Sequence, residues 1–470
     1  MPSSILTFFA IAAIFSLTHV SHAQFGSPDN VIELCRHGAR GPGDNTFDKT
    51  WPSWGLSNLT PAGMRQHFIL GAALAKKYPN IFGSLNPNAV NLMSEGGNRT
   101  TMSALAQAYG LFYGKGPALG NDYPSARAVP PFDMDIINDI GSKLNNSAAL
   151  PFNYYPINIQ IAKGGDYKVI EPRSGCDNFK YYEALSIFSP EAFETWENFT
   201  DLSRYLKRYN LTIPMNNPLA ITGFSDTFAA NYFDHRPLPG GLPTTDDVVA
   251  NITFVASWYG TYLQYGTDVK TNAVATPIVL RLIEVLQAAA QGKLSPFTLY
   301  AGHDIGLLAL LKAFGVVTPD CIIDNFIHYW AWGNKTLKNP ACVYPSFASN
   351  ILIEFYKNPT PSVRFLYNDI MVPLCAGKEF CPLNEFIQFA QNAIGNWTMK
   401  DVNRTCGISP SSFEVDGEIE IALINSSFNN NTGVIILLTS ICIILSLQII
   451  SMKRKERKYN EIIHNQQLLF

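Results

Sequence analysis

The chain has 470 residues, of which 47% are hydrophobic, 12% aromatic and 15% charged, and its formal net charge is −3. This composition is that of a folded globular protein and excludes a disordered, collagen-like or coiled-coil chain. Residues 453–470 carry a net charge of +3, so the rest of the chain carries −6, and this mildly acidic body gives no electrostatic basis for nucleic-acid binding.

The N-terminal residues resemble a secretory signal. Residues 5–17 are almost wholly apolar, and Ser21, His22 and Ala23 follow, with small residues at the positions that a signal peptidase prefers. An N-terminal membrane anchor is the alternative, although the apolar run is short for a span. We therefore expect a signal peptide at 1–23 and a mature chain that begins near Gln24.

Three apolar runs, at 31–35, 89–93 and 297–301, have the character of strands, and each leads into a polar turn and then a helix. The turns read RHGARGP at 36–42, SEGGNR at 94–99 and GHD at 302–304. Strands that alternate with helices predict a parallel sheet, and ligands bind beyond the carboxyl ends of such strands. We therefore expect the three turns to form the site.

The remaining patterns predict helices around this sheet. Thr60-Pro61 and Thr276-Pro277 have the form of helix starts, for helices that run to Tyr78 and Gln291. Residues 136–270 are aromatic-rich, have few strand signals and show helical segments at 179–187, 190–209 and 246–265. The expected fold is α/β, with a mainly parallel sheet flanked by helices. Its core is discontinuous, at 24–135 and 271–406, with a mostly helical cap inserted at 136–270.

A second apolar stretch, at 433–452, is long enough to cross a bilayer at 1.5 Å per residue. Lys453, Arg454 and Lys455 follow at once, which places the tail at 453–470 in the cytoplasm by the positive-inside rule. We therefore expect a single-pass type I membrane protein with a stalk at 407–432 and a lumenal or extracellular body.

Glycosylation sequons and cysteines agree with this compartment. Cys35 lies at a strand end and Cys442 in the apolar stretch, and both are expected to be free. The other six cysteines allow up to three disulfides. No cysteine pattern indicates a zinc site. Asn-x-Ser/Thr sequons recur through the body and suit a glycoprotein; they include Asn58, Asn145, Asn198, Asn210, Asn251, Asn334, Asn396, Asn403, Asn425 and Asn430.

The turn after the first strand carries the sharpest chemical signal. Arg36 and Arg40 flank His37, and two guanidinium groups so close together repel each other unless an anion lies between them. Between two arginines the pKa of His37 would be lowered, which leaves a neutral imidazole able to act as a nucleophile. The alternative is that both arginines are solvated and His37 caps a turn.

The other histidines give weaker signals. His303 and Asp304 at the third strand end could form a helix cap, or could bind a phosphoryl oxygen and donate a proton to a leaving alkoxide. Residues 234–236 (DHR) are followed by PLPGG and predict a solvent-facing loop. His67 and His328 are interpreted as packing or surface residues.

These motifs together resemble the histidine acid phosphatases, of the membrane-bound lysosomal and prostatic type. The resemblance is carried by RHGARGP at 36–42, Arg99 and the His303-Asp304 pair, and it covers most of residues 29–405. Further landmarks are PAGMRQ at 61–66, Gly71, and the segment from Leu374-Cys375 to Cys381-Pro382-Leu383. Gly41 departs from the pattern, since a larger residue is usual there, but no catalytic group is lost.

The resemblance implies a phosphate monoester hydrolase that works through a phosphohistidine on His37. Arg36, Arg40, Arg99 and His303 would hold the phosphoryl oxygens and Asp304 would protonate the leaving group, with no metal or other cofactor. Asn98, in the sequon that overlaps this pocket, is expected to be unglycosylated. Burial or the negative charge of the substrate is expected to raise the pKa of Asp304.

The resemblance also suggests the disulfide Cys176–Cys406. Cys375–Cys381 is expected as a local pair, which leaves Cys321–Cys342 by elimination. The layout suggests a lysosomal, endosomal or cell-surface location. Residues 459–462 (YNEI) have the form of a sorting signal, so the expected partners are the phosphomonoester substrate, a sorting adaptor at Tyr459 and a second copy of the chain in a homodimer.

Two other functions compete with this one. A phosphomutase of the same superfamily makes little sense in a secreted, membrane-tethered chain, and the His303-Asp304 pair favours hydrolysis. A catalytically inactive phosphatase fold could serve as a binding glycoprotein or receptor, although the intact set of six site residues argues against it.

Overall fold

The structure is a computed structural model that describes residues 25–407 except 85, 120–127, 129–147, 175, 177, 180–181, 184–185, 187–188, 190–199, 214–217 and 332–335. The described residues belong to one compact unit, Met1–Gly407. The predicted signal peptide, apolar stretch, tail and sorting motif lie outside the described residues.

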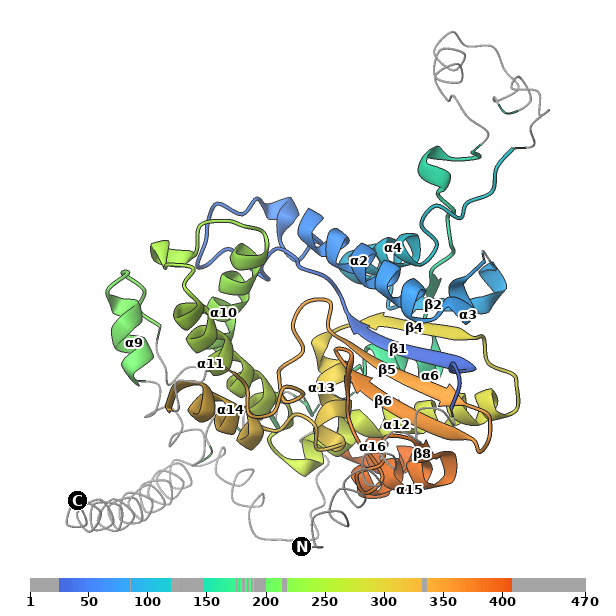
Figure 1. Ribbon diagram of the computed structural model, residues 1–470. Helices are drawn as coiled ribbons and strands as arrows, with labels where there is room; N and C mark the ends of the chain where they lie inside the picture. The colour runs from blue at the N-terminus through green and yellow to red at the C-terminus, as the bar shows by residue number, and fades with distance from the viewer. Residues whose placement is uncertain are drawn as a thin grey trace, which may run out of the picture. The chain divides into compact units, whose positions relative to one another are not determined.

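A single mixed sheet forms the centre of the fold (Figure 1). The strand order is β3-β2-β4-β1-β5-β6-β7, and β8 pairs with β6. β3, β2, β4 and β1 are parallel, as predicted, whereas β5 to β8 add an antiparallel half. The strands are β1 Asn30–Arg36, β2 Val90–Ser94, β3 Gln160–Ile161, β4 Phe297–Gly302, β5 Asn350–Tyr356, β6 Ser362–Tyr367, β7 Ile370–Met371 and β8 Cys381–Pro382.

Helices cover both faces of the sheet, and β1 is accordingly buried on both sides. Val31 and Cys35 pack in one apolar cluster with α2 and α4, while Ile32 and Leu34 pack in a second cluster with α12 and α13. The helices are α2 Pro61–Lys77, α3 Pro79–Phe82, α4 Asn98–Leu111, α6 Gly164–Ile170, α9 Thr200–Lys207, α10 Pro218–Phe233, α11 Asp246–Tyr265, α12 Asp268–Ala290, α13 Asp304–Ala313, α14 Pro319–Ala331, α15 Leu383–Ala393 and α16 Met399–Gly407.

The helix expected after Thr60-Pro61 forms as predicted. The side chain of Thr60 accepts a hydrogen bond from the backbone N–H of Gly63, and Pro61 occupies the first turn. α2 packs closely on α4 because Gly71 has no side chain: a Cβ there would lie 2.1 Å from the carbonyl oxygen of Gln107. This contact fixes both helices over the same face of the sheet.

The start predicted at Thr276-Pro277 is wrong. α12 begins at Asp268 and carries Pro277 in its interior. Residues 273–279 are buried, and this packing outweighs the hydrogen bond that a proline removes from a helix. α12 is also long and apolar enough to cross a membrane, but 67% of its apolar window is buried, as expected of a core helix.

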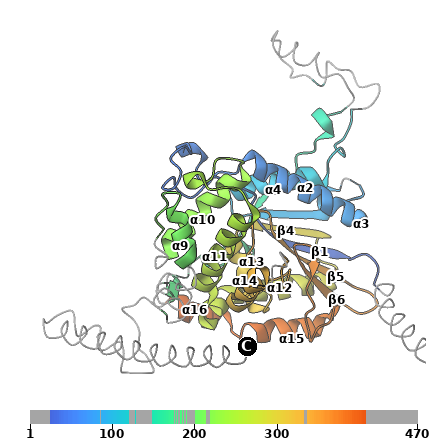
Figure 2. The same cartoon turned by 60° about the vertical axis from the view of Figure 1, so that its left-hand side comes forward.

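The segment predicted to form the cap contains the long helices α10 and α11, which contact each other (Figure 2). α11 has the predicted bounds, whereas α10 was not anticipated. Within the same segment, β3 pairs with β2, and α6 contacts β4 and α12. β3 therefore belongs to the sheet and α6 packs against it. The domain boundaries stay a prediction.

All three predicted disulfides are present, Cys176–Cys406, Cys321–Cys342 and Cys375–Cys381. Cys35 is free, as predicted, and it is buried. The first bridge joins the segment just after α6 to α16, across 230 residues of sequence.

Candidate active site

The three predicted turns meet at one edge of the sheet. Arg36 at the end of β1 pairs with Gly302 at the end of β4, and Ser94 at the end of β2 pairs with the neighbouring Ala301. The backbone N–H of His37 donates to the carbonyl of Gly302, at 2.9 Å. Parallel strands thus bring residues that are far apart in sequence to the same place.

Side chains of two helices hold the turn after β1. The N–H of Gly38 donates to Ser103 Oγ of α4 at 3.0 Å, and the N–H of Ala39 donates to Gln66 Oε1 of α2 at 2.8 Å. A Cβ on Gly38 would lie 2.4 Å from the carbonyl oxygen of Gly63, so only glycine fits this approach.

A buried network of polar side chains contacts the backbone where β1 leads into this turn. Glu33 of β1 contacts the side-chain amides of Asn350 and Gln107, and the amide of Gln107 also contacts His67. His67 Nε2 donates to the carbonyl oxygen of Arg36, at 3.1 Å. His67 is therefore a fully buried packing residue, one of the two roles expected for it.

His37 is buried, with 2% of its surface exposed, and its Nδ1–H donates to the carbonyl of Gly38 at 2.9 Å. In the neutral ring this leaves Nε2 with the lone pair. Burial lowers the pKa of His37 well below its usual value, and the charges of Arg36 and Arg40 lower it further. The structure thus holds a neutral imidazole beside two fixed cations.

Each of these arginines pairs with a carboxylate and lies over the ring of Phe347. Arg36 forms an ion pair with Asp304 at 3.1 Å, and Arg40 forms one with Asp226 of α10 at 3.0 Å. Among the described residues, the buried Nε–H groups of Arg36, Arg40 and Arg99 have no acceptor. These three guanidinium groups therefore retain donors suited to an anion.

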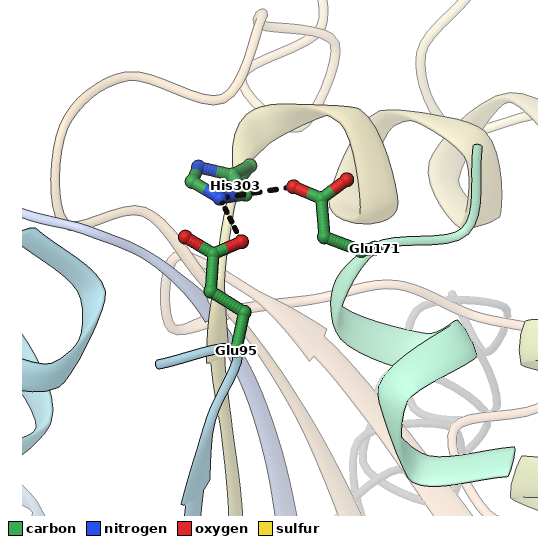
Figure 3. Close-up of side chains that lie close together, drawn as sticks. All are labelled: Glu95, Glu171 and His303. Atoms are coloured by element: carbon green, nitrogen blue, oxygen red, sulfur yellow. Dashed lines mark hydrogen bonds and ion pairs between the residues drawn. The ribbon is translucent and has the colours of Figure 1, made fainter. Parts of the chain in front are cut away.

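Two carboxylates hold the second histidine (Figure 3). His303 Nε2 lies 2.6 Å from Glu95 and 3.0 Å from Glu171, while Nδ1 lies 3.5 Å from Arg99 Nη2. Burial alone would lower the pKa of His303, but the hydrogen bonds to Glu171 and Glu95 outweigh it and raise the pKa. The ring centroids of His303 and His37 are 5.4 Å apart.

Asp304 is the first residue of α13, and its Oδ2 accepts a hydrogen bond from the hydroxyl of Tyr344 at 2.9 Å. Burial raises the pKa of Asp304, as expected, but the charge of Arg36 and the Tyr344 hydroxyl outweigh burial, so the net pKa is lowered. The prediction of a raised pKa is therefore wrong for the protein without substrate, because it did not include the ion pair with Arg36.

Three groups in the described part of the chain could together hold a divalent cation. One oxygen each from Glu95 and Glu171 and one nitrogen of His303 lie within 4.8 Å of one another. A cation there would need the lone pair of Nε2. The distances of 2.6 and 3.0 Å equally fit an Nε2–H that donates to the two carboxylates.

All six residues named from the sequence lie in this site, but several neighbours were missed. Glu95 lies within the SEGGNR turn and was given no role; Glu171, Asp226, Tyr344 and Phe347 had no signal, because they come from segments whose contacts depend on the fold. In the predicted DHR loop, His235 is exposed and Arg236 stacks on Trp51 at 4.1 Å.

Comparisons with known proteins identify the family of this chain. Residues 29–154 match the model of the histidine phosphatase superfamily (branch 2). Bos taurus prostatic acid phosphatase is 31% identical over 397 residues, which cover 79% of this chain and 86% of the relative. Putative acid phosphatase 10 of Caenorhabditis elegans is 24% identical over 429 residues, with coverages of 81% and 93%.

Solved structures share the fold. The phytase of Citrobacter braakii superposes with a TM-score of 0.54 at 14% identity, and the alignment covers 78% of this chain and 98% of the phytase. At this identity the likeness concerns the architecture of the sheet and its helices.

Proposed function

Because this chain belongs to branch 2 of the histidine phosphatase superfamily and is a histidine acid phosphatase, we propose that it hydrolyses phosphate monoesters through a phosphohistidine on His37. The observation that carries this proposal is the buried, neutral His37 beside Arg36 and Arg40, whose Nε–H groups, like that of Arg99, have no acceptor among the described residues.

The first half-reaction transfers the phosphoryl group to the enzyme. The phosphoryl oxygens are bound by Arg36, Arg40, Arg99 and His303. Nε2 of His37 attacks phosphorus as the bond to the leaving oxygen breaks. Asp304 gives its proton to that oxygen. Phosphate draws Arg36 away from Asp304 and adds negative charge, and both changes raise the pKa of Asp304 so that it can carry this proton.

The second half-reaction restores the enzyme. The ionised Asp304 takes a proton from water, the water oxygen attacks phosphorus, and the P–N bond to His37 breaks. Inorganic phosphate leaves and Asp304 is again protonated. In this scheme the arginines supply the positive charge at phosphorus, so activity is expected to be insensitive to EDTA.

The test is direct detection of the intermediate. Rapid quenching of the enzyme with an aryl phosphate, followed by peptide mass spectrometry, should place one phosphate on His37. His37→Ala should lose both the label and turnover, whereas His235→Asn, at an exposed histidine with a left-handed φ of 55°, should keep both. Phosphate on another residue, or turnover in His37→Ala, would refute the mechanism. A wild-type protein that turns over no ester would favour the alternative of a catalytically inactive binding glycoprotein or receptor.

We also propose that the catalytic unit is a lumenal or extracellular glycoprotein with a signal peptide at 1–23 and a type I span at 433–452. The apolar runs, the basic Lys453-Arg454-Lys455 and the sequons support this layout. Protease treatment of sealed vesicles should remove only the tail at 453–470, and a glycosidase should reduce the mass of the protected body. Digestion of the body in sealed vesicles would reverse the proposed topology.

A lysosomal or endosomal location and the two remaining partners are proposals as well. Tyr459→Ala should move the protein toward the cell surface if a sorting adaptor recognises residues 459–462, and an unchanged location would remove that role. A homodimer would double the mass measured by light scattering.

A further inference from the structure

His303 has an arrangement that phosphate binding alone does not require. Glu95, in the turn after β2, and Glu171, just after α6, both contact Nε2 of this one ring (Figure 3). The ring is 5% exposed and the two carboxylates 14% and 25%. Two half-buried carboxylates so close together repel each other unless a proton or a cation lies between them.

The contacts on the other side of the ring decide what Nδ1 can do. Nη2 of Arg99, a group that can only donate, lies 3.5 Å from Nδ1. With the Nε2 proton directed at the two glutamates, Nδ1 is the nitrogen on the side of Arg99, one of the proposed phosphate-binding arginines. A charged ring would direct a second N–H from Nδ1 toward an anion bound there.

We propose that Glu95 and Glu171 are positioning residues of the phosphatase: together they hold the proton of His303 Nε2 and thereby turn Nδ1–H toward a phosphoryl oxygen. This inference rests on the proposed function, and it adds two residues that act on the substrate through His303. Neither touches phosphorus or the leaving group.

The charges around His303 favour its protonated form. Glu95, after β2, and Glu171, after α6, face the ring of His303. Asp304, the first residue of α13, adds a third negative charge. Arg99 of α4 and the neutral His37 after β1 face the other side. The hydrogen bonds and charges of the two glutamates outweigh burial, so the pKa of His303 is raised. The imidazolium is present below that pKa and is lost as pH rises through it.

A divalent cation in the same place is the competing interpretation. A cation would take the Nε2 lone pair, so the neutral ring would have to carry its proton on Nδ1, directed at the donor group of Arg99. The protonated ring also carries an N–H on Nδ1, so the two arrangements differ only at Nε2, where either a proton or a cation lies between the carboxylates. Zn²⁺ binding by the wild type and by the double variant distinguishes them.

The experiment uses the full-length enzyme in detergent and the double variant Glu95→Gln/Glu171→Gln. Glutamine keeps the shape and removes the charge, so kcat/KM for an aryl phosphate at neutral pH should fall about 10- to 100-fold, somewhat less than the loss of a direct donor. An aryl phosphate has a good leaving group and needs little proton from Asp304, so the alkaline limb measured with it reports His303 and should move to lower pH. Glu171→Asp, alone or with Glu95→Gln, should recover part of the loss because it restores a carboxylate.

Glu385→Gln serves as the matched control, because it removes an exposed carboxylate that pairs with Lys378 on the surface. It should leave both kcat/KM and the pH profile unchanged. Circular dichroism and thermal unfolding check that each variant is folded, and the two single variants replace the double one if that does not fold.

Three outcomes overturn the inference while the phosphohistidine mechanism stands: an unchanged alkaline limb in the glutamine variants, an equal loss in Glu171→Asp and Glu171→Gln, or Zn²⁺ binding by the wild type that EDTA reverses and that the double variant lacks. Absence of a phosphate on His37 in the wild type would instead refute the proposed function itself. The two failures are therefore distinguishable.

Discussion

The two histidines of the site are 5.4 Å apart, yet their surroundings have opposite charge. His37 lies beside Arg36 and Arg40, while His303 lies between Glu95 and Glu171. The first environment lowers the pKa and keeps a lone pair available; the second raises the pKa and keeps a proton. His37 works above its lowered pKa and His303 below its raised one, so the opposite shifts widen the pH range in which both are in the required form.

The largest expected effect separates the two rings by role. His37→Ala should lower kcat by about 10⁵-fold or more because it removes the nucleophile. His303→Ala removes one phosphoryl donor and should cost roughly 10²- to 10³-fold. Steady-state rates on one aryl phosphate measure both, and equal losses would mean that the two histidines are not divided into nucleophile and donor.

Asp304 sharpens the comparison because it must carry a proton although Arg36 lowers its pKa in the free protein. Asp304→Asn should keep phosphate binding and lose roughly 10²- to 10⁴-fold in turnover of alkyl esters. Wild-type activity should fall as pH rises through the pKa of Asp304 in the substrate complex.

Aryl esters are the control for this prediction, since a good leaving group needs less proton assistance. The loss in Asp304→Asn should therefore be smaller on aryl than on alkyl phosphates. Identical losses on both would assign Asp304 to positioning rather than proton donation.

Glu33 extends the comparison to a buried acid whose hydrogen-bond partners are neutral amides. Burial raises its pKa to about 7, more than Asn350 and Gln107 lower it. A raised pKa in an acid favours the folded state at low pH. The stabilisation should be fully present below about pH 4.5 and decline until the pH passes about 7, by about 3 kcal/mol in total.

Urea unfolding at pH 5 and pH 8 measures this difference in the free energy of unfolding. Glu33→Gln cannot ionise and should show less dependence on pH than the wild type. The same pH dependence in both proteins would place the titration elsewhere.

The smallest expected effect concerns the arginine side of the comparison. Asp226 pairs with Arg40 and also accepts the backbone N–H of Gly43. Phosphate must compete with this ion pair, so Asp226→Asn should lower the inhibition constant of inorganic phosphate by roughly 2- to 5-fold, the scale of a partly exposed ion pair. Weaker inhibition would show that Asp226 orients Arg40 for phosphate.

The features that the sequence predicts correctly are those formed by residues close together in the chain. The strand ends, the RHGARGP turn and the helix after Thr60-Pro61 are local, because residue type and spacing determine them. Glu171 meets His303, and Asp226 meets Arg40, across more than a hundred residues, and no local pattern encodes such contacts.

The start of α12 was missed for the same reason. Pro277 signals a helix start locally, but tertiary packing of the flanking apolar residues carries the helix through it. The antiparallel half of the sheet, β5 to β8, was not predicted either. Alternating strands and helices indicate parallel pairing, and they carry no information about these antiparallel pairs.

The bridge between Cys176 and Cys406 has a consequence for cleavage of the chain. A single cut between residues 176 and 303 would leave His37 and both glutamates on one fragment and His303 with Asp304 on the other. The disulfide would keep these halves of the catalytic machinery joined as a two-chain protein. After such a cut, the disulfide would be the only covalent link between the two fragments. A reducing agent would then be able to separate the nucleophile His37 from the general acid Asp304.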